Sequence, residues 1–173
     1  ISQLSYVVLG AALVSTLSIQ GASLHIVMHA IGKITLFFVA GAIYVSAHIS
    51  KISELDGQGK SMPLLFLAFF IGSLSIIGVP PMGGSWSKFY LMLGAAESDY
   101  IFVIAVLCIS TLLNVYYLLE IPARAFFKNK IKDIKVENYP LMTIPTLFAA
   151  ILTVIIFFYV EPIKSLTNLI TSN

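Results

Sequence analysis

The chain has 173 residues, of which 58% are hydrophobic and only 10% are charged, and its mean hydropathy is +0.96. Soluble domains carry about 25% charged residues, so this composition predicts a membrane protein. A net charge of +2 does not suggest a nucleic-acid partner. No basic stretch precedes the first apolar run, so we expect no signal peptide and interpret the chain as the C-terminal part of a longer polytopic subunit.

Long apolar runs predict an all-α, polytopic membrane protein with six transmembrane helices. The runs lack the period-two alternation of barrel strands. They cover residues 4–20, 22–48, 62–79, 79–98, 100–122 and 141–160. A Pro-Pro-x-Gly-Gly sequence, which comprises Pro80, Pro81, Gly83 and Gly84, predicts that the backbone breaks there and restarts around Ser85. A broken helix is tolerated at membrane depth only where protein or water satisfies the freed backbone groups.

The basic residues predict the orientation of the chain. Five of the ten Lys and Arg lie between the fifth and sixth runs, namely Arg124, Lys128, Lys130, Lys132 and Lys135. Cytoplasmic loops carry such an excess, so the 123–140 loop is predicted to be cytoplasmic. Counting crossings outward from this loop, we expect the 49–61 loop and a short C-terminal tail on the opposite side.

Three ionisable residues lie inside the second apolar run. His25, His29 and Lys33 recur every fourth residue, which at about 100° per residue places them on one helix face. A charge near the bilayer centre costs at least ~2.5–3.5 kcal/mol, so such residues indicate function. Histidine titrates near neutral pH and burial brings lysine toward that range, so the pattern predicts a proton relay. The alternative is a set of packing residues with satisfied hydrogen bonds.

Two further charged residues are candidates for the same path. Lys88 lies just past the Pro-Pro-x-Gly-Gly break and is either a second proton-loading site or a lysine that snorkels to the interface. Glu120 lies near the end of the fifth run and is either a carboxylate at a channel mouth or part of a surface ion pair. Asn114, well inside that run, is expected to hydrogen-bond between helices. No carboxylate or thiolate cluster completes a metal site around the histidines, and we predict neither a metal nor a cofactor.

Two stretches of the sequence resemble one known family. The first is HIVMHAIGKITLFFVAGAIY, which is similar to the HxxxHAxxKxxLFxxAG pattern of the antiporter-like proton-pumping membrane subunits. The second is MPLLFLAFFIGSLSIIGVPPMGGSWSKFYL, which resembles the MPxxxxxFxIGxLSxxGxPPxxGFxSK pattern of the same family. Such subunits occur in respiratory complex I, in membrane-bound hydrogenases and in Mrp-type multisubunit monovalent cation/proton antiporters.

The resemblance implies two inverted repeats of five helices, each a proton half-channel. Residues 1–122 would form most of the second repeat, 123–140 the basic cytoplasmic loop, and 141–173 the final helix with its tail. Lys88 would match the proton-accepting lysine of the second discontinuous helix. His29 and Lys33 would match the central hydrophilic axis, and His25 its first histidine, which not all members carry.

The chain departs from the family pattern in two places. It has Gly84-Ser85-Trp86 where the pattern has Gly-Phe before Ser-Lys, which can alter packing at the break without removing the lysine. The first repeat, which carries the glutamate–lysine pair that couples neighbouring subunits, is absent. We therefore do not expect this chain alone to pump protons.

The run NVYYLLEIPARAFF and the short tail look similar to the D subunit of the Mrp-type antiporters. We therefore predict a proton-translocating subunit of a Na+ or K+/proton antiporter, located in the inner cell membrane with other membrane subunits as partners. Such a subunit is not itself an enzyme. The alternatives are a proton-pumping subunit of complex I, with no redox site in this chain, and a purely structural membrane scaffold.

Overall fold

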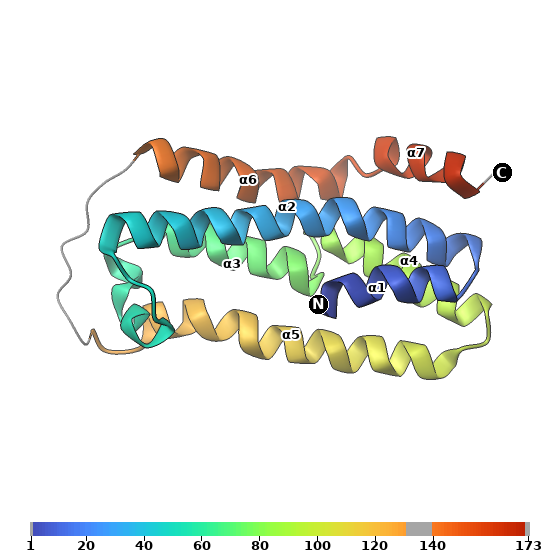
Figure 1. Cartoon of the computed structure of the whole chain (residues 1–173), viewed down its shortest axis with the longest axis horizontal. Coiled ribbons are helices and arrows are strands. Elements are labelled where there is room, and N and C mark those ends of the chain that lie inside the picture. The colour runs from blue at the N-terminus through green and yellow to red at the C-terminus, as the bar shows by residue number, and fades with distance from the viewer. Residues whose placement is uncertain (1, 131–139, 172–173) are drawn as a thin grey trace.

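The computed structural model describes residues 2–130 and 140–171, and all regular structure in these ranges is helical (Figure 1). The α-helices are α1 (Ser2–Ala12), α2 (Thr16–Ala47), α3 (Pro63–Ile77), α4 (Gly84–Glu97), α5 (Ile101–Phe127), α6 (Pro140–Phe158) and α7 (Glu161–Thr171). Two short 3-10 helices, η1 (Ile52–Leu55) and η2 (Gln58–Lys60), lie between α2 and α3. The all-α class predicted from the sequence is confirmed.

Three of the described helices are each long and apolar enough to cross a membrane. They are α2 with 32 residues, α5 with 27 and α6 with 19. A span requires about 20 residues at 1.5 Å per residue. Helix α3 is apolar but has only 15 residues, and it begins with Pro63 at its first position, where the missing N–H costs nothing.

Helix α2 lies at the centre of the bundle. It contacts α1, α3, α4, α6 and α7, and it runs along the whole length of the molecule (Figure 1). Small residues allow the closest of these contacts, because a Cβ atom on Gly94 of α4 would lie 2.5 Å from the backbone nitrogen of Ser18 in α2. The same applies to Gly10 of α1, where a Cβ would lie 2.7 Å from the Cβ of Ala22. Small residues at helix interfaces are typical of membrane bundles.

The first predicted span, 4–20, is wrong. Helix α1 ends at Ala12, Val14 adopts a left-handed backbone with φ 52°, and α2 starts at Thr16. Ser15 caps α2: its hydroxyl accepts from the Ser18 amide while the Ser18 hydroxyl accepts from the Ser15 amide. This reciprocal cap satisfies free amides at the start of α2 and fixes the boundary inside an apolar run. At 11 residues, α1 is only about 16 Å long.

Helices α3 and α4 meet around the Pro-Pro-x-Gly-Gly sequence. Helix α3 ends at Ile77, Gly78 closes it in a left-handed conformation with φ 85°, and α4 begins at Gly84. A Cβ on Gly84 would overlap the carbonyl oxygen of Ser75, so the end of α3 and the start of α4 touch through backbone atoms. The Gly83 amide donates to the Thr153 carbonyl of α6 at 2.9 Å, which satisfies one freed donor between the two helices.

The 49–61 loop and the C-terminal end of α5 lie at the same end of the bundle. The Gly57 amide donates to the Arg124 carbonyl at 3.2 Å. The prediction that this loop faces away from the basic loop is therefore wrong. It counted 62–79 and 79–98 as separate crossings, whereas α3 and α4 follow each other along the bundle and α5 returns beside them (Figure 1).

Two predicted helix ends also change. Helix α5 continues through Pro122 to Phe127, so Arg124 lies on the helix and not in the basic loop. Residues 161–171, predicted as part of a short tail, form α7, which starts with Glu161 and Pro162. An acidic residue and a proline favour a helix N-terminus. Of the predicted basic loop, Lys132 and Lys135 lie outside the described residues.

Candidate functional site

The predicted ladder on α2 runs from the interior to the surface. His25 is 3% exposed, His29 is half-buried and Lys33 is exposed. The His25 and His29 rings stack with their planes 4° apart and their centroids 5.7 Å apart. The four-residue spacing therefore does place these side chains on one face, with two imidazoles in contact.

Lys33 and His29 line a groove between α1, α2, α3 and α5. The groove has a volume of about 380 Å³ and is mostly apolar, with Gln3, His29, Lys33 and Tyr117 among its polar residues. Among the described residues, no protein group hydrogen-bonds to either side-chain polar atom of buried Gln3 or to His29 Nδ1. Buried polar atoms normally have partners. Two residues that line this groove, Gln3 and His29, therefore carry buried polar atoms without a partner in the described part of the chain.

Lys88 occupies a second position, at the interruption between α3 and α4. It is 6% exposed, and its Nζ atom donates to the Ile77 carbonyl at 2.7 Å and to Thr111 Oγ1 at 3.2 Å. Because Ile77 is the last residue of α3, its carbonyl has no partner within that helix and is free to accept. Nζ also lies 5.0 Å from the centre of the Tyr6 ring, within cation–π range. Lys88 is thus a buried lysine held by neutral groups, not a snorkelling one.

A pocket of about 340 Å³ opens onto Lys88 from the side of α5. Its lining includes Gly78, Ser85 and Thr111. The pocket is separate from the groove that contains Lys33. Each of the two predicted lysines therefore has its own hollow in the bundle.

His25 links the ladder to α4. Its Nδ1 lies 2.9 Å from Ser87 Oγ, and the Ser87 hydroxyl donates its proton to the Gly84 carbonyl. Because a hydroxyl has one proton, Ser87 accepts from His25, and the neutral imidazole carries its proton on Nδ1. Nε2 is then the basic nitrogen. Tyr6 contacts both His25 and Lys88: its ring centroid lies 5.2 Å from that of His25, and Lys88 Nζ lies over the same ring.

Trp86, in the Gly84-Ser85-Trp86 stretch that departs from the family pattern, holds the start of α4 against α6. Its indole Nε1 donates to the Phe157 carbonyl at 3.0 Å, and the two rings have centroids 5.7 Å apart. The predicted hinge residues Pro80, Pro81 and Gly83 lie between α3 and α4, and Gly84 is the first residue of α4.

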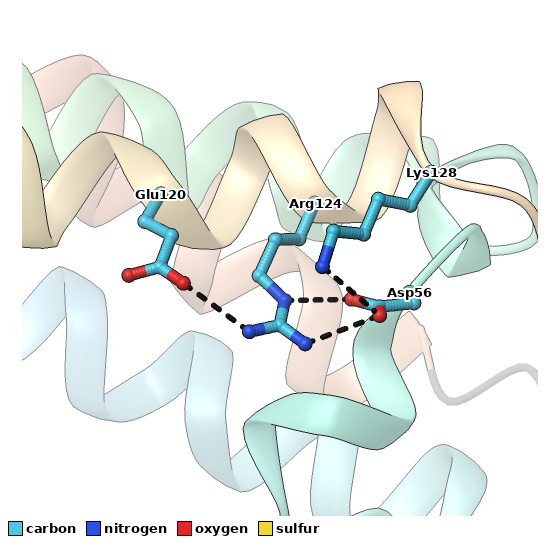
Figure 2. Close-up of polar contacts among 4 residues, drawn as sticks. All are labelled: Asp56, Glu120, Arg124 and Lys128. Atoms are coloured by element: carbon cyan, nitrogen blue, oxygen red, sulfur yellow. Dashed lines mark hydrogen bonds and ion pairs between the residues drawn. The ribbon is translucent and has the colours of Figure 1, made fainter.

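Glu120 lies apart from these residues, in an ion-pair cluster at the end of α5 (Figure 2). Its carboxylate pairs with Arg124 at 3.2 Å, and Arg124 binds both Asp56 oxygens, at 2.7 and 3.1 Å. Lys128 adds a contact to Asp56 at 3.4 Å. The Arg124 guanidinium holds the pKa of Asp56 below its ordinary value, chiefly by hydrogen bonding. The structure thus gives Glu120 an ion pair and does not bring it to Lys33 or Lys88.

The sequence of residues 1–114 matches the family described as NADH:quinone oxidoreductase/Mrp antiporter, TM. The chain belongs to this family. The matched residues include the whole of α1 to α4, and therefore the His25–Lys33 ladder and Lys88.

Two curated relatives illustrate the range of this family. The chain is 39% identical over 128 residues to NADH-quinone oxidoreductase subunit N of Desulforudis audaxviator, a match covering 74% of this chain and 26% of the relative. It is 32% identical over 165 residues to the D subunit of the Na(+)/H(+) antiporter of Alkalihalophilus pseudofirmus, covering 94% of this chain and 34% of the relative. The chain spans about a quarter to a third of the length of these relatives.

Solved structures of two assemblies share the fold. A chain of the Mrp complex from Dietzia sp. DQ12-45-1b aligns with a TM-score of 0.86 at 21% identity, over 96% of this chain and 39% of that chain. A chain of respiratory complex I from Thermus thermophilus aligns with a TM-score of 0.66 at 20% identity, over 94% and 43% of the two chains.

Several residues around Lys88 and His25 were not found by sequence reasoning. Tyr6, Ser87 and Thr111 each contact Lys88 or His25 directly. Ser87 precedes Lys88 in the matched pattern, which is the one signal that pointed to it. Tyr6 and Thr111 are far from Lys88 in sequence and carry no local motif, so only the packing of α1 and α5 reveals them.

Proposed function

We propose that this chain is part of a proton-translocating membrane subunit of a multisubunit monovalent cation/proton antiporter. The observation that carries the proposal is the similarity to the D subunit of a Na(+)/H(+) antiporter, which extends over 94% of the chain. It therefore reaches beyond the 1–114 match into the last helices. Family membership and the two buried or half-buried histidines beside a buried lysine support the same conclusion.

In the proposed path, Lys88 takes a proton from one side of the membrane through the pocket formed with α5. The proton then passes to His25 and His29 and reaches Lys33 in its groove. From Lys33 it moves on toward the other half-channel. Lys88 and His25 are both packed against Tyr6, and His25 and His29 stack, so the successive sites are close together. Glu120 acts at the mouth of the path, at the end of α5. Na+ or K+ exchange is coupled to this charging and discharging.

The membrane arrangement is part of the proposal. Residues 1–122 correspond to the second repeat of the subunit, and 141–173 to its final helix and C-terminal segment. Helices α3 and α4 act as one interrupted crossing, with Pro80, Pro81, Gly83 and Gly84 as its hinge. The segment between α5 and α6 faces the cytoplasm, as the basic residues in its sequence favour. The partners are other membrane subunits of a complex in the inner cell membrane.

A second candidate is a proton-pumping subunit of a complex I-type enzyme, where electron transfer drives the same residues. The 39% identity to NADH-quinone oxidoreductase subunit N favours it. A third, from another class, is a structural scaffold in which Lys33 and Lys88 only hydrogen-bond. Each of these alternatives predicts a response to substitution of Lys33 or Lys88 that differs from the response expected of an antiporter.

The test uses everted membrane vesicles from cells that produce the protein with its native partner subunits. A fluorescent dye reports the transmembrane pH difference, a respiratory substrate energises the vesicles, and Na+ or K+ is then added. Wild type is compared with Lys88→Ala and Lys33→Ala at matched membrane levels. Tyr116→Phe on the exposed face of α5 is the control, because its side chain is 76% exposed.

The antiporter proposal expects added cation to collapse the pH difference in wild type and in the control but not in the lysine variants. If the cation has no effect and NADH-driven formation of the pH difference falls in the variants, the complex I-type function replaces it. Variants that equal wild type in both assays, or that fail to assemble, would leave the scaffold function.

A further inference from the structure

Tyr6 lies between Lys88 and the first histidine of the ladder. It is buried, and its ring lies against both Lys88 and His25, at 5.0 Å from Lys88 Nζ and 5.2 Å from the His25 ring. The face of an aromatic ring favours an ammonium ion. On the side that faces His25, the ammonium group of Lys88 therefore contacts the Tyr6 ring.

The hydroxyl of Tyr6 is held by a polar stripe on α5. Tyr6 Oη shares a hydrogen bond with Ser110 Oγ at 2.7 Å, and Asn114 Nδ2 donates to Tyr6 Oη at 3.5 Å. Asn114 is itself buried, and its Oδ1 accepts from the Tyr117 hydroxyl at 2.7 Å. Ser110, Asn114 and Tyr117 recur at three- and four-residue steps, so they form one face of α5. The prediction that Asn114 hydrogen-bonds between helices is confirmed.

The other end of this stripe reaches the groove of Lys33. Tyr117 lines that groove together with Gln3, His29 and Lys33. The chain of contacts from Lys88 through the Tyr6 ring, Asn114 and Tyr117 thus arrives in the same space as the histidine ladder, by a separate route along α5. One route passes through imidazoles on α2, and the other is built from hydroxyls and an amide on α1 and α5.

We propose that Tyr6, Asn114 and Tyr117 form a hydrogen-bonded strut that positions the Tyr6 ring between Lys88 and His25 and couples the Lys88 pocket to the Lys33 groove. The three are positioning residues. Loss of the Tyr6 hydroxyl removes both contacts of this ring with α5, at Ser110 and Asn114. Loss of the Tyr117 hydroxyl leaves the Ser110 contact but frees the Asn114 amide, so either change loosens the Tyr6 ring between Lys88 and His25. This inference rests on the proposed proton path.

The test measures the initial rate of cation-induced collapse of the pH difference in the same vesicles, for Tyr6→Phe, Tyr117→Phe and the double variant. Each substitution removes one hydroxyl and keeps the ring. Tyr116→Phe is the matched control, since it lies next to Tyr117 on the exposed side of the same helix. Lys88→Ala is run alongside as the reference for the path itself.

If the strut acts as one unit, each single variant lowers the rate about fivefold, the equivalent of one neutral hydrogen bond. The double variant then loses no more than the single ones, because the unit is already broken. Independent packing roles would instead multiply to about 25-fold, and that result would overturn the proposal. Transport rates equal to that of Tyr116→Phe would also overturn the proposal. If the two single variants failed to assemble at wild-type levels, the proposal would be overturned as well, because the residues would then be needed for folding.

The outcomes separate this inference from the proposed function. If Lys88→Ala is inactive while the two Phe variants equal wild type, the path stands and the strut does not. If Lys88→Ala transports normally, the proposed function fails, and the strut fails with it.

Discussion

Lys88 Nζ donates to the carbonyl oxygen of Ile77 at 2.7 Å, across the interruption that separates α3 from α4. Ile77 is the last residue of α3, and Lys88 lies one turn into α4. The last carbonyls of a helix have no partner within it and, with the helix dipole, favour a positive charge. The interruption therefore supplies the acceptor that makes a buried lysine tolerable at this position. It also ties the position of Lys88 to the way the two helix ends approach each other.

Gly84→Ala is expected to disrupt this approach. A Cβ at residue 84 would overlap the Ser75 carbonyl oxygen, which is backbone and cannot move aside alone. Overpacking of this kind costs about 1–3 kcal/mol or more. Gly41→Ala is the matched control, because a Cβ there meets nothing within 4 Å and alanine favours a helix interior. The melting temperature in detergent and the amount of protein in the membrane should both fall for Gly84→Ala and stay at wild-type values for Gly41→Ala. Equal stability of the two variants would contradict the backbone contact.

The parts of this fold that follow local rules could be predicted from the sequence. The four-residue spacing of His25, His29 and Lys33 was enough to place them on one face, because helical periodicity is a local property. The prolines and glycines before Lys88 were enough to expect a backbone break. The apolar runs were enough for the helical membrane class, although only three of the described helices are each long and apolar enough to span a membrane.

The predictions that were wrong concern features that depend on contacts for which the local sequence gives no signal. The boundary at Ser15 lies inside a run of uniform hydropathy and depends on two serines that cap each other's amides. The side of the 49–61 loop depends on Asp56 and Arg124, which are 68 residues apart. Arg124 looked like a loop charge that sets topology, whereas it lies on α5 and holds Asp56. Tyr6 reaches Lys88 only because α1 packs beside α4.

Ser87→Ala is expected to weaken transport through His25. The Ser87 hydroxyl accepts from His25 Nδ1, so its loss frees the imidazole to change tautomer or rotate. We expect the initial transport rate to fall about fivefold, as for one neutral hydrogen bond, with normal membrane levels. Ser165→Ala on α7 is the control, since the Ser165 hydroxyl is exposed and donates to the Pro162 carbonyl within its own turn. Equal rates for the two variants would remove Ser87 from the path.

Glu120→Gln tests whether this carboxylate handles protons. Glutamine keeps the size of the side chain and an oxygen that accepts from Arg124, but it cannot take up a proton. If Glu120 serves at the mouth of the path, the transport rate falls severalfold while membrane levels stay normal. The measurement is the same dye assay, with Glu161→Gln as the exposed control. An unchanged rate would restrict Glu120 to its ion pair with Arg124.

The ion pairs of Asp56 predict how stability depends on pH. Hydrogen bonding to Arg124 holds the pKa of Asp56 below its ordinary value in the folded protein. The folded state therefore binds a proton here less readily than the unfolded chain does. The stabilisation from Asp56 is present above the ordinary carboxyl pKa of about 4 and is lost as the pH falls through the lowered pKa.

Asp56→Asn should therefore have a lower melting temperature than wild type at pH 7, with a difference that stays constant down to about pH 5 and shrinks below pH 4. The measurement is thermal unfolding in detergent across this range. Glu161→Gln is the control, because its carboxylate is 78% exposed and pairs only with Lys164 in the same helix turn among the described residues. Exposed pairs of this kind contribute little, so its melting temperature should follow wild type at every pH. A difference for Asp56→Asn that persists undiminished at pH 3 would mean that the Asp56 carboxylate is not what joins the 49–61 loop to α5.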